Sequence, residues 1–328
     1  MSEIKQSINK TQVVGTLLEL NMEVTTKEVT LKGNNGIEKK VECKQIGKKD
    51  FKNPMFLIDV KGMNIGVDFY PVSEKKLDES GNIVSNSKFT AMETVMDKYI
   101  PKIKDAENAT RVKVDGCLVN QEYVSKDTYE FKCFPQVQGF QITSTNVPEE
   151  DIADCEISGI IRSIIPETKG EDAEETGRLK VELYTFNRNA ETTPFTFIVE
   201  SDLADDFNSF YEAGQSVKLY YEIITKQVGA KKPTTGGFGR RESHMVSGFS
   251  VTEYSVFRGD TAYEEESEYY INPEDMKQAL NERDIKINNM VKVAKENKDK
   301  PKSSPKGASS SGTKANPFGS ASTKKSPF

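Results

Sequence analysis

The order of secondary-structure patterns repeats within this chain, and that repeat limits the folds open to it. Each half shows three segments of alternating apolar residues, one segment with helical spacing, and two more alternating segments. The first half places them at residues 12–20, 55–60, 64–70, 88–103, 111–119 and 129–134, the last running into 139–143. The second half places them at residues 155–161, 179–186, 195–199, 201–214, 217–224 and 245–252. The repeated order therefore predicts that the chain contains an internal duplication.

Short residue matches support the duplication. Residues 112–114 resemble 217–219 directly after each helix, residues 139–143 resemble 248–252 in each last strand, and Gly15 and Gly159 lie in the opening strands. Five strands with one helix between the third and fourth is the order of the OB-fold, a small barrel. A glycine in the first strand suits the sharp bend that such a barrel needs.

The sequence thus predicts a mainly β protein with two OB-fold-like five-stranded barrels, each carrying one helix. We expect the first barrel, with insertions, at residues 1–148 and the second at residues 149–258. An acidic linker and a C-terminal helix follow at residues 259–296, where Asn272 caps the helix and Pro273 takes its first position. The Lys/Ser/Pro/Gly-rich residues 297–328 lack periodicity and are expected to be a disordered tail. In the second half, Ser201 is the expected N-cap of the helix.

The charge of the chain is uneven. The formal net charge is −6, but the residues from Lys295 onward carry +6, which leaves −12 for the first 294 residues. An acidic body repels polyanions, so nucleic-acid binding requires local basic patches.

Catalytic and metal-binding patterns are missing from the sequence. The single histidine, His244, has no evident partner, and neither a phosphate-binding G-x-x-x-x-G-K-[ST] nor an H-E-x-x-H motif occurs. The four cysteines form no C-x-x-C pair. We expect a protein that is not an enzyme and needs no cofactor or metal. No apolar run approaches 18 residues and the N-terminus does not resemble a signal peptide, so we expect a cytoplasmic protein that does not enter membranes.

Cations and aromatics gather on strands and loops in a pattern typical of single-stranded nucleic-acid binding, which needs flat rings for bases and cations for phosphates. The hairpin at residues 217–252 has a glycine-rich basic tip, expected to be the loop between strands 4 and 5 of the second barrel. Candidate residues of the second half are Lys231, Lys232, Phe238, Arg240 and Arg241 in that tip, and Lys180, Tyr184, Phe186, Arg188, Lys218 and Tyr220 on or beside the strands. Candidates of the first half are Lys39, Lys40, Lys48, Lys49, Lys61, Tyr70, Lys113, Lys132 and Phe134. If both barrels bind, we expect the second to clamp the strand through its tip and the first to rely on the lysine-rich segment from Lys27 to Lys52.

With tandem barrels and a tail, the chain resembles the single-stranded DNA-binding proteins of bacteria and bacteriophages, over about residues 10–257. Those proteins end in acidic residues followed by Pro-Phe, and here Pro327 and Phe328 match the last two positions, whereas Lys324 and Lys325 stand where acids would be. The resemblance implies sequence-independent binding of single-stranded DNA in replication, recombination or repair. It also implies recruitment of replication or recombination proteins by the tail, and a location in the cytoplasm, that of the host if the protein is viral.

Other interpretations stay open at the level of sequence. RNA is an alternative ligand, and either one or both barrels could bind. A protein of a different class, a structural or protein-interaction component such as a viral assembly factor, would show the same barrels without nucleic-acid binding.

Overall fold

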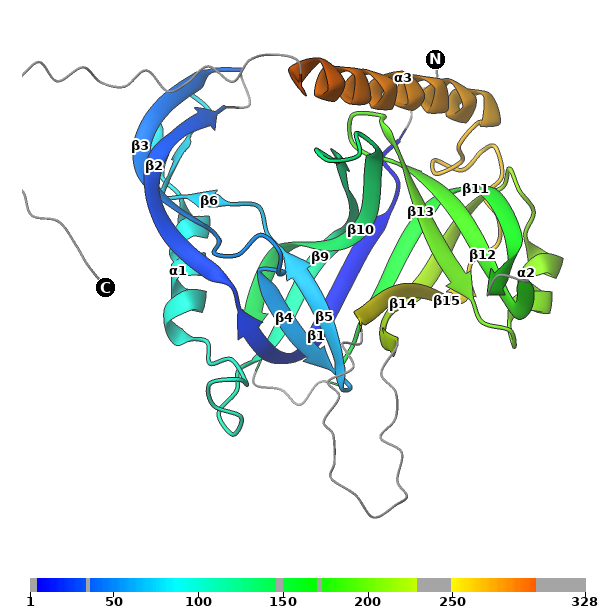
Figure 1. The fold of residues 1–328 in the computed structure, drawn as a ribbon, viewed down its shortest axis with the longest axis horizontal. Helices are drawn as coiled ribbons and strands as arrows, with labels where there is room; N and C mark the ends of the chain where they lie inside the picture. The colour runs from blue at the N-terminus through cyan, green and yellow to red at the C-terminus, as the bar shows by residue number, and fades with distance from the viewer. Residues whose placement is uncertain (1–4, 34–35, 146–149, 170–172, 229–248, 299–328) are drawn as a thin grey trace, which may run out of the picture.

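The computed structural model describes residues 5–33, 36–145, 150–169, 173–228 and 249–298. It is built mainly of β-strands arranged as two neighbouring barrels, with a long helix across one end (Figure 1). Each barrel has one helix between its third and fourth strands. The predicted fold class is therefore confirmed for these residues, and the tail lies outside them.

The first barrel closes through the pairing order β1-β4-β5-β10-β9-β1. β5 and β10 run parallel and the other pairs are antiparallel, which is the OB-fold arrangement. The strands are β1 (Asn9–Leu20), β4 (Phe56–Val60), β5 (Met63–Asp68), β9 (Arg111–Val124) and β10 (Phe131–Ser144). The predicted strand segments at residues 129–134 and 139–143 form one continuous strand, β10.

Two insertions enlarge the first barrel. A long hairpin follows its first strand, and a segment of short strands precedes its helix. The insertions consist of β2 (Met22–Lys32) and β3 (Glu38–Lys48), then β6 (Val72–Ser73), β7 (Lys75–Leu77) and β8 (Ile83–Ser85), and the barrel helix α1 (Ser87–Lys98) follows. β6 pairs with β3, so the two insertions share a three-stranded sheet, and β7 and β8 form a separate two-stranded one.

The second barrel repeats the arrangement without large insertions. Its pairing order is β11-β12-β13-β15-β14-β11, again with a parallel pair between the third and fifth strands. The elements are β11 (Asp154–Lys169), β12 (Glu174–Phe186), β13 (Thr192–Val199), α2 (Ala204–Phe210), β14 (Ser216–Val228) and β15 (Phe249–Gly259).

Equivalent glycines show that the two barrels are built alike. Gly15 pairs with Val112, and Gly159 pairs with Val217 in the corresponding place. A Cβ on Gly15 would lie 2.3 Å from the carbonyl oxygen of Asp59 on β4, and a Cβ on Gly159 would lie 2.3 Å from that of Tyr184 on β12. β4 and β12 are the second strands of their barrels. The first and second strands can approach this closely only where the side chain is absent, which is why each opening strand carries a glycine.

The predicted match of the last strands is wrong. Gly116 pairs with Gly139, whereas Tyr221, which takes the place of Gly116 in the second barrel, pairs with Val256. Val256 therefore occupies the position of Gly139, and residues 249–252 lie at the start of β15. The strand runs on to Gly259 because it must reach past β13 to close the barrel.

A short antiparallel pairing joins the barrels. Asn9, Lys10 and Thr11 of β1 pair with residues 155–157 of β11, so both barrels share one ten-stranded sheet. Buried side chains of the two barrels belong to one apolar cluster. The barrels thus form a single packed body.

Two helix boundaries differ from those predicted. The first helix ends at Lys98, because Pro101 disfavours helical geometry at Ile100 and the amides of Lys102 and Ile103 donate to β1 carbonyls instead. Ser201 lies in a turn and is not the N-cap: α2 begins after Leu203, and no side chain caps it.

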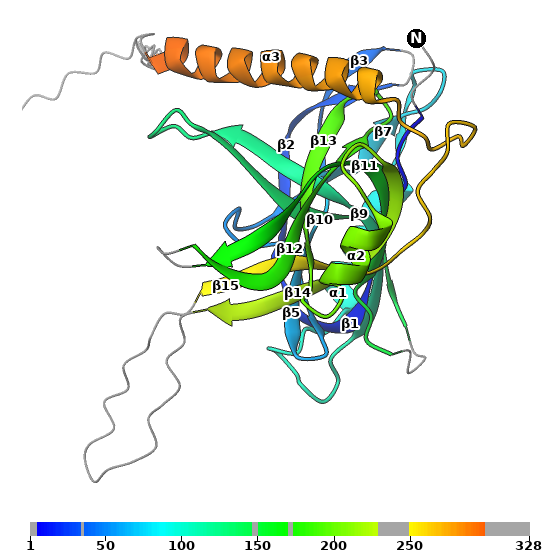
Figure 2. The ribbon, with the colours of Figure 1, turned by 90° about the vertical axis from the view of Figure 1, so that its right-hand side faces the viewer.

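The C-terminal helix α3 (Pro273–Lys298) lies across one end of both barrels (Figure 2). Its predicted start is confirmed, since the Asn272 side chain accepts a 2.9 Å hydrogen bond from the amide of Glu274. The Arg283 guanidinium contacts Glu122 of β9 and donates to the carbonyl of Thr192 on β13 at 3.1 Å. α3 therefore ties the first barrel to the second. Among the helices of the described residues, none has the length and apolar character to cross a membrane.

Candidate nucleic-acid interface

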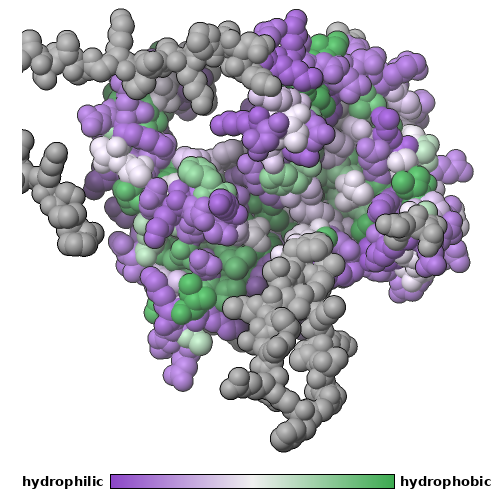
Figure 3. Space-filling model, viewed as in Figure 1, coloured by the Kyte–Doolittle hydropathy of each residue, from purple (hydrophilic) through white to green (hydrophobic). Residues whose placement is uncertain are grey.

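A groove beside the first barrel, here called the barrel-1 groove, gathers cations and exposed rings. It lies between the end of β2, the β6–β8 segment and β10, and its volume is about 460 Å³. Figure 1 shows the β2–β3 hairpin standing away from β10, and the space-filling view keeps the space between them open (Figure 3). The charged residues of its described lining are Lys32, Lys75, Lys76 and Lys88, without an aspartate or glutamate. The groove therefore presents positive charge only.

Three of these lysines form no ion pair with a carboxylate of the described residues. Lys32 forms a 2.7 Å ion pair with Glu38, but this pair is exposed and contributes little to stability. Within the part of the chain that the structure describes, no ion pair involves Lys75, Lys76 or Lys88. Their ammonium groups are available to a phosphate backbone.

Two aromatic side chains project into the groove. Tyr70 lies two residues after the end of β5 and is 68% exposed, and Phe140 on β10 is 59% exposed. The pairing of β10 with β9 shifts register between Gly139 and Gln141, so Phe140 is the extra residue of a β-bulge. A Cβ on Gly139 would lie 2.3 Å from the Phe69 ring. The glycine lets β10 pack against Phe69, and the bulge turns Phe140 outward.

Tyr70 belongs to the predicted residues, whereas Phe140, Lys75, Lys76 and Lys88 do not. The glycine before Phe140 signals a bulge or close approach, and this signal could have marked it. Lys75 and Lys76 come from the short strand β7 and Lys88 from the first turn of α1, so nothing in their spacing indicates a common face.

The other predicted residues of the first half lie outside this groove. Lys48 is mostly buried and forms a 2.6 Å ion pair with Asp68, so its charge is already compensated. Lys40 pairs with Glu28 at 3.2 Å and Lys132 with Glu130 at 3.2 Å, both on the surface. Lys39, Lys49 and Lys61 are exposed, Lys113 is half-buried, and Phe134 is 42% exposed on β10.

The prediction that Tyr184 and Phe186 face solvent is wrong. Tyr184 is 7% and Phe186 2% exposed, because Met276 and Ala279 of α3 and the preceding Ile271 pack on them. Alternation places these rings on the outer face of β12 correctly, but that face is covered. With α3 in place, neither ring can stack on a base.

Lys218 and Tyr220 are engaged within the protein. The Lys218 ammonium lies 2.5 Å from Glu156 and 4.8 Å from the centre of the Tyr220 ring. Burial alone would lower the pKa of Lys218, but the interactions with Glu156 and Tyr220 outweigh it and raise this pKa. The Tyr220 hydroxyl donates to Asp260 at 3.0 Å, and the Arg258 guanidinium lies 3.8 Å from its ring centre. This cation and this ring already have partners.

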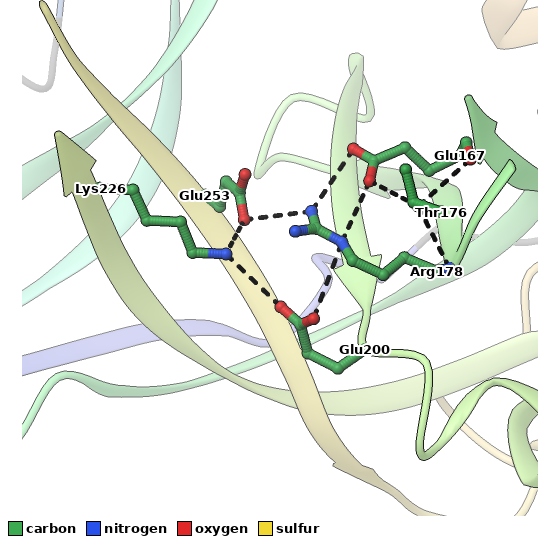
Figure 4. Close-up of polar contacts among 6 residues, drawn as sticks. All are labelled: Glu167, Thr176, Arg178, Glu200, Lys226 and Glu253. Atoms are coloured by element: carbon green, nitrogen blue, oxygen red, sulfur yellow. Dashed lines mark hydrogen bonds and ion pairs between the residues drawn. The ribbon is translucent and has the colours of Figure 1, made fainter. Parts of the chain in front are cut away.

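The loop edge of the second barrel is internally paired as well. Arg178 is buried, and its guanidinium lies 3.1 Å from Glu167 and 3.1 Å from Glu253, while Lys226 lies 2.7 Å from Glu253 (Figure 4). With Glu200, 3.7 Å from Arg178, three carboxylates face two cations. Counted over these described residues, the edge carries a net negative charge, unlike the barrel-1 groove.

The remaining predicted residues have simple placements. Lys180 is half-buried on β12, and Arg188 is exposed in the turn between β12 and β13. The tip residues Lys231, Lys232, Phe238, Arg240 and Arg241, and the terminal Pro327 and Phe328, lie outside the described residues. Within the residues that are described, no group of three His, Cys, Asp or Glu side chains could hold a metal ion.

The fold and the groove define a protein with two joined OB-fold barrels, one of which carries a lysine-rich groove with exposed rings. The chain belongs to the YorF family, whose model matches residues 7–297.

Two solved structures of the single-stranded DNA-binding protein from Thermus aquaticus are similar in fold. The wild-type protein is 10% identical with a TM-score of 0.40, and the match covers 80% of this chain and 97% of that one. A deletion mutant is 12% identical with a TM-score of 0.38, covering 80% and 98%. No curated protein sequence matches the chain.

Proposed function

We propose that this protein binds single-stranded DNA without sequence specificity, as a non-enzymatic component of DNA replication, recombination or repair. The observation that carries the proposal is the barrel-1 groove, in which four lysines and two exposed rings meet without a carboxylate. Lysines neutralise phosphates, and flat rings stack on any base, so this combination favours binding that does not depend on sequence.

The rings favour a single strand over a duplex. In a duplex the faces of the bases are stacked on one another, and a ring can stack only on a base that is free. A stacked base contributes about 1–3 kcal/mol, so Tyr70 and Phe140 together supply about 2–6 kcal/mol. Phosphate contacts from the groove lysines add to this, which offsets repulsion by the acidic remainder of the chain.

Fluorescence anisotropy of a labelled oligo-dT, titrated at low and at physiological salt, tests the proposal. We expect Tyr70→Ala and Phe140→Ala each to weaken binding by about fivefold to a hundredfold, the equivalent of one lost stack. Phe210→Ala is the matched control, because Phe210 is 72% exposed on α2, away from the groove, and its removal should leave affinity unchanged.

Two outcomes would contradict the proposal. Absence of oligo-dT binding by the wild-type protein at low salt would favour a structural or protein-interaction role instead. Binding that Tyr70→Ala and Phe140→Ala leave intact would place the interface elsewhere. Parallel titration with oligo-U measures the preference between DNA and RNA.

A further inference from the structure

A second groove lies where the two barrels meet, and it is here called the interbarrel groove. β5 and β10 of the first barrel face β14 and β15 of the second across it, and its volume is about 300 Å³. A 3.1 Å hydrogen bond from the Thr225 hydroxyl to the Asn64 carbonyl links the two walls. The interbarrel groove is therefore a feature of the joined barrels and of neither barrel alone.

Exposed rings mark this groove. Phe51, in the turn after β3, is 85% exposed, and Phe134 on β10 is 42% exposed. Tyr123 on β9 is 45% exposed and meets Phe134 edge to face, with ring centres 6.0 Å apart. Phe51 and Phe134 thus line the groove, with Tyr123 beside Phe134, and exposed apolar side chains gathered in this way are typical of a binding surface. The edge-to-face contact holds the Phe134 ring in a defined orientation.

The interbarrel groove continues the barrel-1 groove along three elements. β3 contributes Gln45 to the barrel-1 groove and Lys48 to the interbarrel groove. The chain at the end of β5 contributes Tyr70 to the barrel-1 groove and Asp68 to the interbarrel groove. β10 carries Phe140 in the barrel-1 groove and Phe134 in the interbarrel groove. The two are six residues apart along the strand, which corresponds to about 20 Å. Rings therefore recur along one track over the outside of the first barrel.

Charge decides between this track and a second route from Phe140. A different groove, here called the seam groove, also contains Phe140 and leads along β1 and β11 to Phe257. Its lining carries two cations, Lys10 and Arg258, and three carboxylates, Asp115, Asp154 and Glu156. The interbarrel groove carries two lysines, Lys48 and Lys52, and one carboxylate, Asp68. A phosphate backbone leaving the barrel-1 groove meets less repulsion on the interbarrel side.

We propose that the interbarrel groove is a second base-stacking site, in which Phe51 and Phe134 receive bases of the same strand that occupies the barrel-1 groove. This inference rests on the proposed function and adds the course of the strand, from Tyr70 and Phe140 across β10 to the junction of the barrels. A short oligonucleotide fills the barrel-1 groove alone, and a longer one reaches both sites.

Binding of oligo-dT of two lengths tests the inference, because an OB-fold occupies about 4–16 nucleotides. The probes are a dT of about 6 and one of about 20 nucleotides, each titrated by anisotropy with the full chain. We expect Phe51→Ala and the double change Phe51→Ala/Phe134→Ala to weaken binding of the long probe by about fivefold or more and to leave the short probe unchanged. Phe51→Ala removes a ring that packs on almost nothing, so it preserves the fold.

Phe257→Ala is the matched control. Phe257 is 44% exposed in the seam groove, and its removal should change neither titration. Wild-type-like binding of the long probe by both Phe51 variants, while Tyr70→Ala still weakens both probes, would overturn the inference and leave the proposed function standing. Selective weakening of the long probe by Phe257→Ala would overturn it in favour of the seam route. Failure of the wild-type protein to bind either probe would refute the proposed function itself.

Discussion

At the scale of single residues, Glu253 joins the two cations at the loop edge of the second barrel (Figure 4). Its carboxylate accepts hydrogen bonds from Lys226 at 2.7 Å and from Arg178 at 3.1 Å. Burial alone would raise the pKa of Glu253, but Lys226 and Arg178 outweigh it and lower this pKa below its usual value. The charged form of Glu253 therefore stabilises the folded state.

The direction of this shift predicts a response to acid. A carboxyl group whose pKa is lower in the folded state contributes its stability above the unfolded pKa, about 4.3 for glutamate, and loses it as the pH falls further. We expect Glu253→Gln to cost about 2 kcal/mol at pH 7, as charge-assisted hydrogen bonds do, and to make the loss of stability between about pH 4.5 and 3 shallower. Urea unfolding across this pH range measures both effects.

Glu212→Gln is the control for this acid response. Glu212 is exposed after α2, so the same change of charge there should leave stability and its pH dependence as in the wild-type protein. An acid profile of Glu253→Gln that coincides with that of the wild type would show that Glu253 does not contribute to acid stability.

At the scale of elements, α3 acts as a strap over the second barrel. Its first turns pack on Tyr184 and Phe186, and Lys286 and Arg283 further along form ion pairs with Glu191 and Glu122. Beyond Lys286 the helix is more open, and Val293 is 53% exposed. The strap is therefore held by its part up to Lys286.

This arrangement predicts different costs for two substitutions in α3. Met276 is 6% exposed against the β12 rings, so Met276→Ala should destabilise the protein by about 2–5 kcal/mol through the cavity it leaves. Val293→Ala removes a similarly apolar but exposed side chain and should cost about 0.5 kcal/mol or less. Equal costs in chemical denaturation would contradict the packing of α3 on β12.

A β-bulge in the fifth strand of each barrel is a second feature at this scale. In each barrel the fifth strand shifts register against the fourth and leaves one phenylalanine as the extra residue, Phe140 in β10 and Phe257 in β15. Both rings are consequently exposed. The two barrels thus present equivalent outward rings in different surroundings. Phe140 lies in the lysine-rich barrel-1 groove, whereas Phe257 lies in the seam groove, whose lining has more carboxylates than cations.

At the scale of the whole molecule, the distribution of charge matters more than its sum. The chain carries −6 overall, yet the barrel-1 groove presents four lysines without a carboxylate in its described lining. The loop edge of the second barrel presents more carboxylates than cations. Among the described residues, the barrel-1 groove is therefore the surface whose charge favours a polyanion, and the tip through which we expect the second barrel to clamp the strand lies outside the described residues.

Salt dependence measures this distribution. For single strands the slope of log K against log salt changes by about 0.7 for each phosphate contact. Replacing Lys75, Lys76 and Lys88 together by Gln should reduce the slope by about 2 if each contacts one phosphate. The exposed Lys98, Lys104 and Lys292, replaced together by Gln, change the net charge equally and should leave the slope nearly unaltered. Equal slopes for the two triple variants would show that binding depends on net charge and not on the groove.

The sequence by itself determined the local parts of this protein. Alternation of apolar residues marks strands of both barrels, and the asparagine and proline at the start of α3 mark a helix end. The glycines Gly15 and Gly159 mark the close approach of strands. These signals work because each depends on the residue and its immediate neighbours along the chain.

Only the tertiary structure decided which outer faces stay exposed. Alternation shows that Tyr184 and Tyr70 point away from a barrel interior, but Met276, about ninety residues further on, covers one ring and nothing in the described chain covers the other. The pairing of β1 with β11 and the convergence of groove lysines from β2, β7 and α1 are likewise contacts between distant segments. Such contacts depend on how elements pack in space, which the pattern along one strand does not encode.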